Sequence, residues 1–271
     1  MSAAVPFSTR PSAFFIGLLM AALTLLVPRE SRPEACVLPS QHVGLTFPVE
    51  KVEREWACRL EPIVSQYTTA NKVGPVKTAL AETVYLYLLD RPPTAAALIN
   101  RLDLGLYKSD MRGPGRYWGS DGEGTEGIVQ LVYHDDKSRI YFLEGTHHSR
   151  ALPNIRGKAV VFLRMKPVTD AQGAEAVETT LVSYVRLDNR FLSGLLSLLR
   201  PLIGNTVTRK LLKGVETVNR LGLEMRQHPE RVLFEAMDPP ALPAEDVAFL
   251  KQALAGRQEP GKMKSQPVAP R

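Results

Sequence analysis

The stretch from Asn189 to His228 constrains the fold most, because its apolar residues recur at helical spacing over its whole length. It predicts a long helix close to the C-terminal end of the folded region. Pro201 and Gly204 are expected to kink or break this helix near its middle. The apolar positions are Leu192, Leu195, Leu196, Leu199, Ile203, Val207, Leu211, Val215, Val218 and Met225.

Two shorter helical patterns and a series of alternating segments precede this helix. Residues 78–89 and 91–105 carry apolar residues at helical spacing, and after Gly105 the period switches to two. Consecutive hairpins of this kind predict an antiparallel sheet, so the expected fold class is α+β. The candidate strands are Leu106–Arg112, Arg116–Ser120, Gly127–His134, Arg139–Thr146, Lys158–Lys166 and Ala176–Leu187.

This order of elements resembles the START-like superfamily, which is also known as the polyketide cyclase and lipid-transport (SRPBCC) superfamily. Residues 83–90 (TVYLYLLD) resemble its first helix, and residues 180–188 (TLVSYVRLD) resemble its last strand entering the final helix. The resemblance covers about residues 74–229 and implies a helix-grip fold, in which a curved sheet wraps around the long helix. It also implies a first strand before Thr78 and an apolar cavity for a lipid-like ligand.

The N-terminal end of the sequence has the features of an export signal. Ala13 to Val27 is an uncharged apolar run that follows Arg10, which is typical of a signal peptide or an uncleaved membrane anchor. The expected location is therefore the cell envelope, in the periplasm or on the outer side of the inner membrane. A disulfide between Cys36 and Cys58 is plausible in that setting. Lipidation of Cys36 is the disfavoured alternative, because the residues before it do not fit such a signal.

Four regions follow from these patterns. Residues 1–36 are expected to form the signal peptide or membrane anchor, and residues 37–73 a Pro-rich linker with a short helix. Residues 74–229 form the expected START-like domain. Residues 230–271 are expected to be a C-terminal extension that is largely disordered after residue 257.

Aromatic and basic residues in the predicted strands are the candidates for ligand binding. The aromatic side chains could line an apolar pocket or could be ordinary core residues. Arg164 and Arg186 could meet an anionic headgroup if they face the cavity, or could lie on the solvent face of the sheet. The aromatic candidates are Tyr117, Trp118, Tyr133, Tyr141, Phe142, Phe162 and Tyr184.

Catalytic and metal-binding patterns are weak. Glu144 and His148 occupy in-phase positions and could form an acid–base pair, with Tyr184 as a further candidate, but an exposed strand end is the favoured explanation. The sequence predicts no metal site and no cofactor. Gly122–Gly127 matches GxGxxG, but a strand follows it and two glutamates would repel phosphate, so a turn at a cavity mouth is expected instead.

The net charge of +6 is spread along the chain, which excludes a dense nucleic-acid interface but leaves an attraction to anionic headgroups open. The expected function is binding or transport of a lipid-like hydrophobic molecule in the cell envelope, with the membrane surface or an N-terminal anchor as a partner. A cyclase- or hydrolase-like enzyme in the same cavity and a non-catalytic interaction protein are the alternatives.

Overall fold

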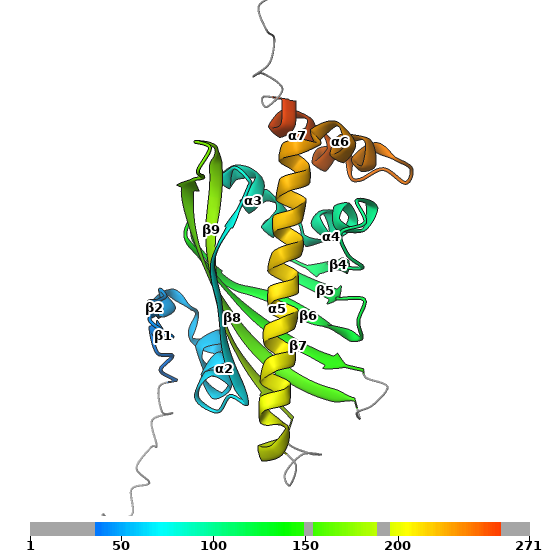
Figure 1. Ribbon diagram of the computed structural model, residues 1–271. Coiled ribbons are helices and arrows are strands. Elements are labelled where there is room, and N and C mark those ends of the chain that lie inside the picture. The colour runs from blue at the N-terminus through cyan, green and yellow to red at the C-terminus, as the bar shows by residue number, and fades with distance from the viewer. Residues whose placement is uncertain (1–35, 149–153, 189–195, 256–271) are drawn as a thin grey trace, which may run out of the picture. The chain divides into compact units, whose positions relative to one another are not determined.

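A computed structural model describes residues 36–148, 154–188 and 196–255, and Figure 1 shows a long helix packed on one side of an antiparallel sheet. No helix within these ranges combines the length and the apolar character that crossing a membrane requires. The apolar run 13–27 lies outside the described residues. The elements are β1 (Gln41–His42), β2 (Leu45–Thr46), η2 (Val49–Lys51), α2 (Arg54–Ser65), β3 (Thr69–Thr78), α3 (Glu82–Asp90), α4 (Pro92–Arg101), β4 (Lys108–Gly113), β5 (Arg116–Ser120), β6 (Thr125–His134), β7 (Ser138–His147), β8 (Ile155–Thr169), β9 (Glu175–Leu187), α5 (Leu196–Gln227), α6 (Pro229–Met237) and α7 (Ala244–Ala255).

The main sheet has seven strands in the order β3-β9-β8-β7-β6-β5-β4, and every neighbouring pair is antiparallel. The strands β4 to β9 follow one another along the chain as hairpins, as predicted. The first strand, β3, instead pairs with the last, β9, and α3 and α4 connect it to β4. The sheet and the long helix packed on it have the helix-grip architecture that the resemblance implied.

The two faces of the sheet are covered by different parts of the chain. The Thr208 hydroxyl of α5 donates a hydrogen bond to Asn71 Oδ1 on β3 (2.8 Å), so Asn71 and its in-phase neighbours form what we call the inner face. Lys72, the next residue along β3, donates to the Val43 carbonyl between β1 and β2 (3.3 Å), which marks the outer face. Because side chains alternate along each strand, the register assigns every strand residue to one of these faces.

Helix α5 follows the edge strand β3 along the inner face. A Cβ built on Gly204 would lie 3.3 Å from Thr69 Oγ1, and Thr78 Oγ1 donates a hydrogen bond to Asn219 Oδ1 (2.5 Å). The predicted break is wrong, because one helix runs through both Pro201 and Gly204. Gly204 therefore allows a close approach to β3 rather than ending the helix.

The C-terminal extension is folded, which corrects the expectation that the domain ends at residue 229. Helices α6 and α7 contribute Val232, Ala236, Leu250 and Leu254 to a buried cluster that also contains the end of α5 and residues of α3 and α4. These apolar positions recur at helical spacing and bury one side of each helix. Residues after 257 lie outside the described part of the chain.

The predicted linker, residues 37–73, is also largely folded. The hairpin β1–β2, the turn η2 and helix α2 pack onto the outer face and bury Phe47 against Phe162, with ring centroids 5.1 Å apart. Strand β3 begins at Thr69, so the sheet starts before the predicted boundary at residue 74. Cys36 and Cys58 form a disulfide that attaches the start of this segment to α2. Loop-like composition concealed this packing, because the buried side chains of the segment do not follow one continuous helical or strand pattern.

A row of glycines crosses the inner face. Gly119, Gly127, Gly145 and Gly157 are directly opposite one another on β5, β6, β7 and β8. A Cβ on Gly127 would lie 2.4 Å from the Glu144 carbonyl oxygen, and one on Gly145 would lie 2.5 Å from that of Glu126. Larger residues therefore do not fit where these backbones approach each other, and this strip of the inner face lacks side chains.

Candidate functional site

The inner face carries a continuous apolar row next to the glycines. Tyr117, Val129, Leu143, Ala159 and Val185 are directly opposite one another on β5, β6, β7, β8 and β9. All of these side chains are only partly buried. On the outer face of the same strands Phe142, Val160 and Phe162 are buried. This apolar row is therefore incompletely covered, although it lies on the side of the sheet that faces α5.

The next row combines apolar and polar side chains. Leu131, Tyr141, Val161, Ser183 and Asn71 are opposite one another in register, and the first three are partly buried. Ser183 and Asn71 are buried, and neither Ser183 Oγ nor Asn71 Nδ2 has a hydrogen-bond partner among the described residues. Buried polar atoms usually have partners, so these two atoms can accommodate a polar group that the chain itself does not supply.

Helix α5 is held at both margins of this surface. On one side it contacts β3, and on the other side Lys210 Nζ lies 2.5 Å from Asp121 Oδ2 in the turn between β5 and β6. Lys213 pairs with Glu123 in the same turn. Burial alone would raise the pKa of Asp121, but the Lys210 ammonium and backbone amides of the turn hold it below its usual value.

This turn contains the GxGxxG match. Gly122 and Gly124 have positive φ angles of 69° and 91°, so the segment is a turn between two strands and not the start of a helix. Glu123 of this turn forms an ion pair with Lys213 of α5. The segment is therefore a turn, as expected; it lies at one margin of the inner face and lacks the strand-to-helix geometry of a dinucleotide site.

A buried arginine lies at the end of the inner face nearer to α3. Arg139 is 3% exposed and forms an ion pair with Asp90, while the Tyr117 hydroxyl donates to the Asp90 carbonyl (3.0 Å). Burial raises the pKa of the neighbouring Tyr141 to about 12, so this phenol stays protonated near neutrality. Sequence analysis did not identify Arg139, because a basic residue at the start of a strand normally faces solvent.

Only two of the nine predicted ligand residues face α5. Tyr117 and Tyr141 lie on the inner face, and the register places the others on the outer face, which corrects the expectation that they share one cavity. The alternation of each strand was correct, but alternation does not say which face the long helix covers. The outer-face residues are Trp118, Tyr133, Phe142, Phe162, Arg164, Tyr184 and Arg186.

These outer-face residues have structural partners in the N-terminal segment. Phe162 and Tyr184 pack with His42, and Arg164 donates to the Thr46 carbonyl and lies over the Phe47 ring. The Tyr133 hydroxyl donates to Asp135 (2.9 Å). Most of the predicted aromatic set therefore forms a second core under β1, β2 and α2. The apolar inner residues Val129, Leu143 and Val185 were missed; the first two have a glycine two positions away on the same face, which could have indicated them.

The three catalytic candidates do not converge. Glu144 lies 3.7 Å from Lys158 Nζ, while His148 lies 3.8 Å from Glu126 and donates from Nδ1 to Asn154 Oδ1 (2.9 Å). The side chains of Glu144 and His148 are about half exposed, whereas Tyr184 is buried beneath the N-terminal segment. A general acid or base needs hydrogen-bond reach to a shared substrate, and this arrangement does not provide it.

No protein-family model and no curated protein matches this sequence. Similar solved structures include a conserved protein from Geobacillus kaustophilus, at 8% identity over 58% of this chain and 95% of that chain, with a TM-score of 0.41. A START superfamily protein from Mycobacterium smegmatis is 8% identical over 58% of this chain and 97% of that one, with a TM-score of 0.39. Ara h 8.0201 is 9% identical over 58% and 99%, with a TM-score of 0.29. These identities and TM-scores are too low to carry an argument. The fold is assigned from the strand order and the element order of this chain, which are those of the helix-grip fold that the START-like resemblance implied.

Proposed function

We propose that this protein binds a hydrophobic, lipid-like ligand between α5 and the inner face of the sheet, and that it does so in the cell envelope. The observation that carries the proposal is the partly buried apolar row from Tyr117 to Val185. An apolar surface on the side that faces the long helix, yet left partly open, is the surface expected of a site that a ligand completes.

Burial of apolar surface supplies the binding free energy in this proposal. A ligand that removes about 300 Å² of apolar surface from water gains roughly 7 kcal/mol before the cost of ordering it is subtracted. The glycine row widens the space beside Val129 and Leu143, because none of its residues carries a side chain. Affinity therefore depends on the shape of the inner face more than on specific polar contacts.

Ser183 and Asn71 orient the ligand. Their unpartnered Oγ and Nδ2 atoms are adjacent across β9 and β3 and lie on the same face as the apolar rows. A hydroxyl or carbonyl at one end of an otherwise apolar molecule satisfies both atoms. A ligand without such a group leaves them unpaired, at a cost of about 1–3 kcal/mol.

The envelope location is supported by the sequence and by the disulfide. The run Ala13–Val27 has the composition of an export signal or anchor. Cys36 and Cys58 are the only cysteines of the chain and are joined to each other, and structural disulfides persist in oxidising compartments.

Native mass spectrometry of the full-length protein, purified in a mild detergent, tests the binding proposal. Organic extraction of the same sample then identifies any ligand that co-purifies. We expect a lipid or isoprenoid at close to one molecule per chain. A clean ligand-free mass, together with no uptake from a lipid mixture, would contradict the proposal and would favour an interaction protein.

A further inference from the structure

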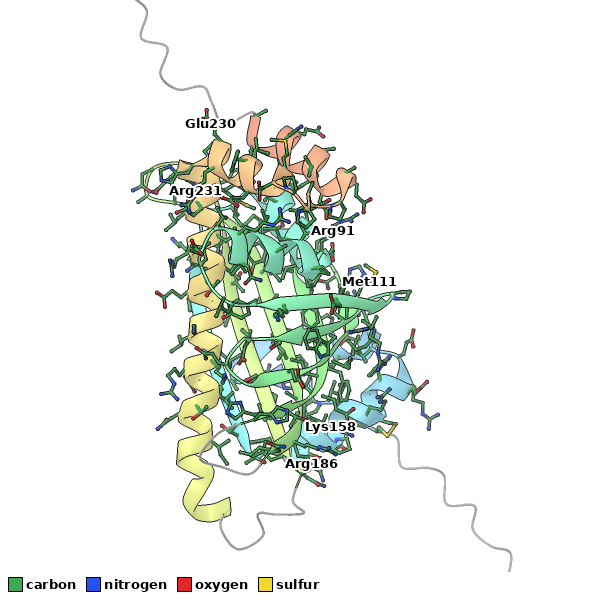
Figure 2. The ribbon with its side chains drawn as sticks, turned by 90° about the vertical axis from the view of Figure 1, so that its right-hand side faces the viewer. Arg91, Met111, Lys158, Arg186, Glu230 and Arg231 are labelled. Atoms are coloured by element: carbon green, nitrogen blue, oxygen red, sulfur yellow. A yellow bond between two sulfur atoms is a disulfide. The ribbon has the colours of Figure 1, made fainter. Side chains whose placement is uncertain are left out.

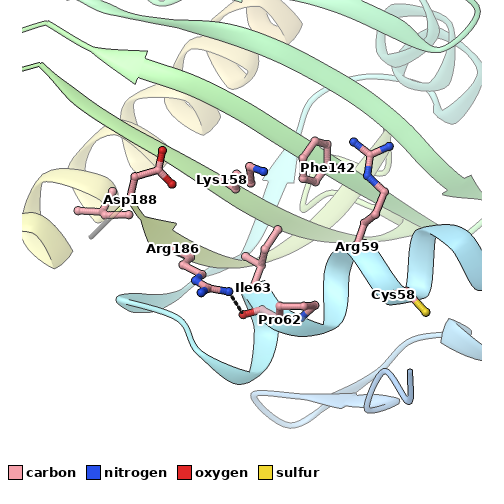
Figure 3. A pocket seen from close by; sticks show the side chains of 9 residues that line it. Cys58, Arg59, Pro62, Ile63, Phe142, Lys158, Arg186 and Asp188 are labelled. Carbon is pink, nitrogen blue, oxygen red and sulfur yellow. Dashed lines mark hydrogen bonds between the residues drawn. The ribbon is translucent and has the colours of Figure 1, made fainter. Parts of the chain in front are cut away.

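A pocket of about 420 Å³ lies on the outer face, between α2 and the ends of β8 and β9. Figure 3 shows basic side chains from α2, β8 and β9 around it, with Phe142 and Ile63 among the apolar lining residues. The lining residues are Cys58, Arg59, Pro62, Ile63, Phe142, Lys158, Arg186, Leu187 and Asp188. We call this site the basic pocket; it is separated from the proposed ligand surface by the thickness of the sheet.

The basic pocket has more positive than negative charge. Arg59, Lys158 and Arg186 line it, and Asp188 is the only carboxylate among its lining residues. Glu144 lies nearby, 3.7 Å from Lys158, but both side chains of this pair are about half exposed. An exposed ion pair of this kind is weak and leaves the ammonium available to a better partner.

Neither arginine is neutralised by a carboxylate of the described chain. Arg186 donates one hydrogen bond to the Pro62 carbonyl (3.0 Å), which uses one of the five donors of its guanidinium. Arg59 lies over the Trp56 ring at 4.3 Å and over the Phe142 ring at 5.1 Å. Within residues 36–148, 154–188 and 196–255 neither side chain forms an ion pair. Their positions are therefore fixed by neutral groups, and no carboxylate of the described residues forms an ion pair with either guanidinium.

We propose that the basic pocket binds the phosphate group of an anionic ligand. Guanidinium and ammonium groups are the usual partners of phosphate oxygens, and three of them line this pocket. The volume of 420 Å³ leaves room for an organic group attached to the phosphate, which Ile63 and Phe142 contact. A lipid headgroup and a soluble phosphate ester share this chemistry.

The position of the pocket along the chain favours the lipid headgroup as the source. Cys58 lines the pocket and is joined to Cys36, and the apolar run 13–27 ends nine residues before Cys36. Nine residues span at most about 30 Å. If the apolar run enters a membrane, the length of this segment limits how far Cys36, which is joined to Cys58 at the pocket, can lie from the headgroups. The inference goes beyond the proposed function, because it concerns the opposite face of the sheet and another ligand.

Trp56 provides the readout for the test. For this test, Trp118→Phe is introduced into the full-length protein. Trp56, which contacts Arg59, is then its only tryptophan. It is titrated in neutral detergent micelles with dihexanoyl phosphatidylglycerol, dihexanoyl phosphatidylcholine and glycerol 3-phosphate. We expect a saturable fluorescence change with phosphatidylglycerol and none with phosphatidylcholine, whose phosphate is neutralised within its own headgroup. Equal affinity for glycerol 3-phosphate would support the pocket and identify a soluble ester as its ligand.

Lys158→Gln is the decisive variant, because Lys158 is exposed and its loss does not threaten folding. Losing one charge-assisted contact is expected to weaken binding of phosphatidylglycerol at least about tenfold. Arg186→Gln is a second variant, which is also expected to weaken binding of phosphatidylglycerol. Lys166→Gln is the matched control, since Lys166 is exposed on the same strand and face but does not line the pocket, and it should change affinity less than twofold.

Two results would overturn the proposal: no saturable response to any of the three probes, or equal effects of Lys158→Gln and Lys166→Gln. Val129→Glu on the inner face separates the two sites, because it should leave the phosphatidylglycerol response unchanged. If an apolar probe fails to bind while the pocket binds phosphatidylglycerol, only the proposed function of the inner face fails.

Discussion

The imidazole of His42 stacks on the ring of Phe162, with centroids 3.9 Å apart and planes inclined by 24°. His42 belongs to the short strand β1 and Phe162 to the central strand β8, so this contact joins the N-terminal segment to the outer face of the sheet. His42 Nδ1 also lies 3.2 Å from the Tyr184 hydroxyl. Figure 2 shows α2 on the side of the sheet opposite to α5, so a helix packs against each face of the sheet.

Burial of His42 makes stability depend on pH. Burial disfavours the charged ring and lowers the pKa from 6.5 to about 4, although a backbone hydrogen bond at Pro39 acts in the opposite direction. The unfolded chain therefore binds a proton at a higher pH than the folded chain. The contribution of His42 is complete above pH 6.5 and is lost as the pH falls from 6.5 to 4, by about 3 kcal/mol in total.

Urea denaturation at several pH values between 7.5 and 4 measures this effect. His42→Gln should flatten the pH dependence in this range, whereas His134→Gln, at an exposed position, should leave it unchanged. The same slope in the wild type and in His42→Gln would show that His42 is not the titrating group.

The disulfide should contribute substantially to stability. It joins residues 22 positions apart, and closing a loop of this length stabilises a folded protein by about 3 kcal/mol through the unfolded state. Denaturation with and without a reductant measures the difference, and the double variant Cys36→Ser/Cys58→Ser should match the reduced wild type. An unfolding midpoint that does not respond to reductant would refute this prediction.

The C-terminal helix α7 is attached through a buried carboxylate. Asp246 is 1% exposed and accepts hydrogen bonds from Tyr87 (2.5 Å) on α3 and from Thr94 on α4. Asp246→Ala removes the partner of the buried Thr94 hydroxyl and of the partly buried Tyr87 hydroxyl, and should lower the free energy of unfolding by about 2–4 kcal/mol.

Glu245→Ala is the matched control for Asp246→Ala. Its side chain is 66% exposed and pairs with Arg91, so its removal should cost less than about 1 kcal/mol. Thermal unfolding of both variants measures the difference. Equal losses would mean that α7 is not held by the buried carboxylate.

The variant Ser183→Ala distinguishes a ligand-binding role of the Ser183 hydroxyl from a structural role. Because Ser183 Oγ is buried without a partner, Ser183→Ala should leave the free energy of unfolding unchanged or raise it by about 1 kcal/mol. The same variant should weaken binding of an apolar ligand that carries a terminal hydroxyl, but not of the corresponding hydrocarbon. Chemical denaturation and paired ligand titrations check both parts, and a large loss of stability would contradict them.

The order of elements could be read from the sequence because each pattern is local. Hairpins such as β6–β7 and the helical spacing of α5 depend on neighbouring residues only, and both were predicted correctly. Pro201 was misjudged because a helix that packs along β3 can compensate for one missing hydrogen bond. Strand β3 was hard to recognise because its partner is distant in sequence, and Gly74 interrupts its pairing with β9.

The site could be predicted only in part, because alternation along a strand does not identify the face that a distant element covers. Tyr117 and Trp118 are neighbours with similar chemistry, yet the first faces α5 and the second lies on the outer face. Phe162 is as apolar as any expected pocket residue, but the N-terminal segment covers it. Which face of the sheet each element covers depends on the contacts of β3 with α5 and with the β1–β2 hairpin, and these elements are remote from one another in the sequence.

Titration of the full-length protein with the fluorescent fatty acid cis-parinaric acid tests the inner-face site most directly. Val129 and Ile128 are adjacent on β6, are both partly buried, and point to opposite faces of the sheet. Val129→Glu introduces a charge where the ligand is proposed to lie and should weaken binding at least about tenfold, because burying an unpaired carboxylate is costly. Ile128→Glu should change the affinity less than twofold. No saturable binding by the wild type, or equal effects of the two substitutions, would contradict the proposed function.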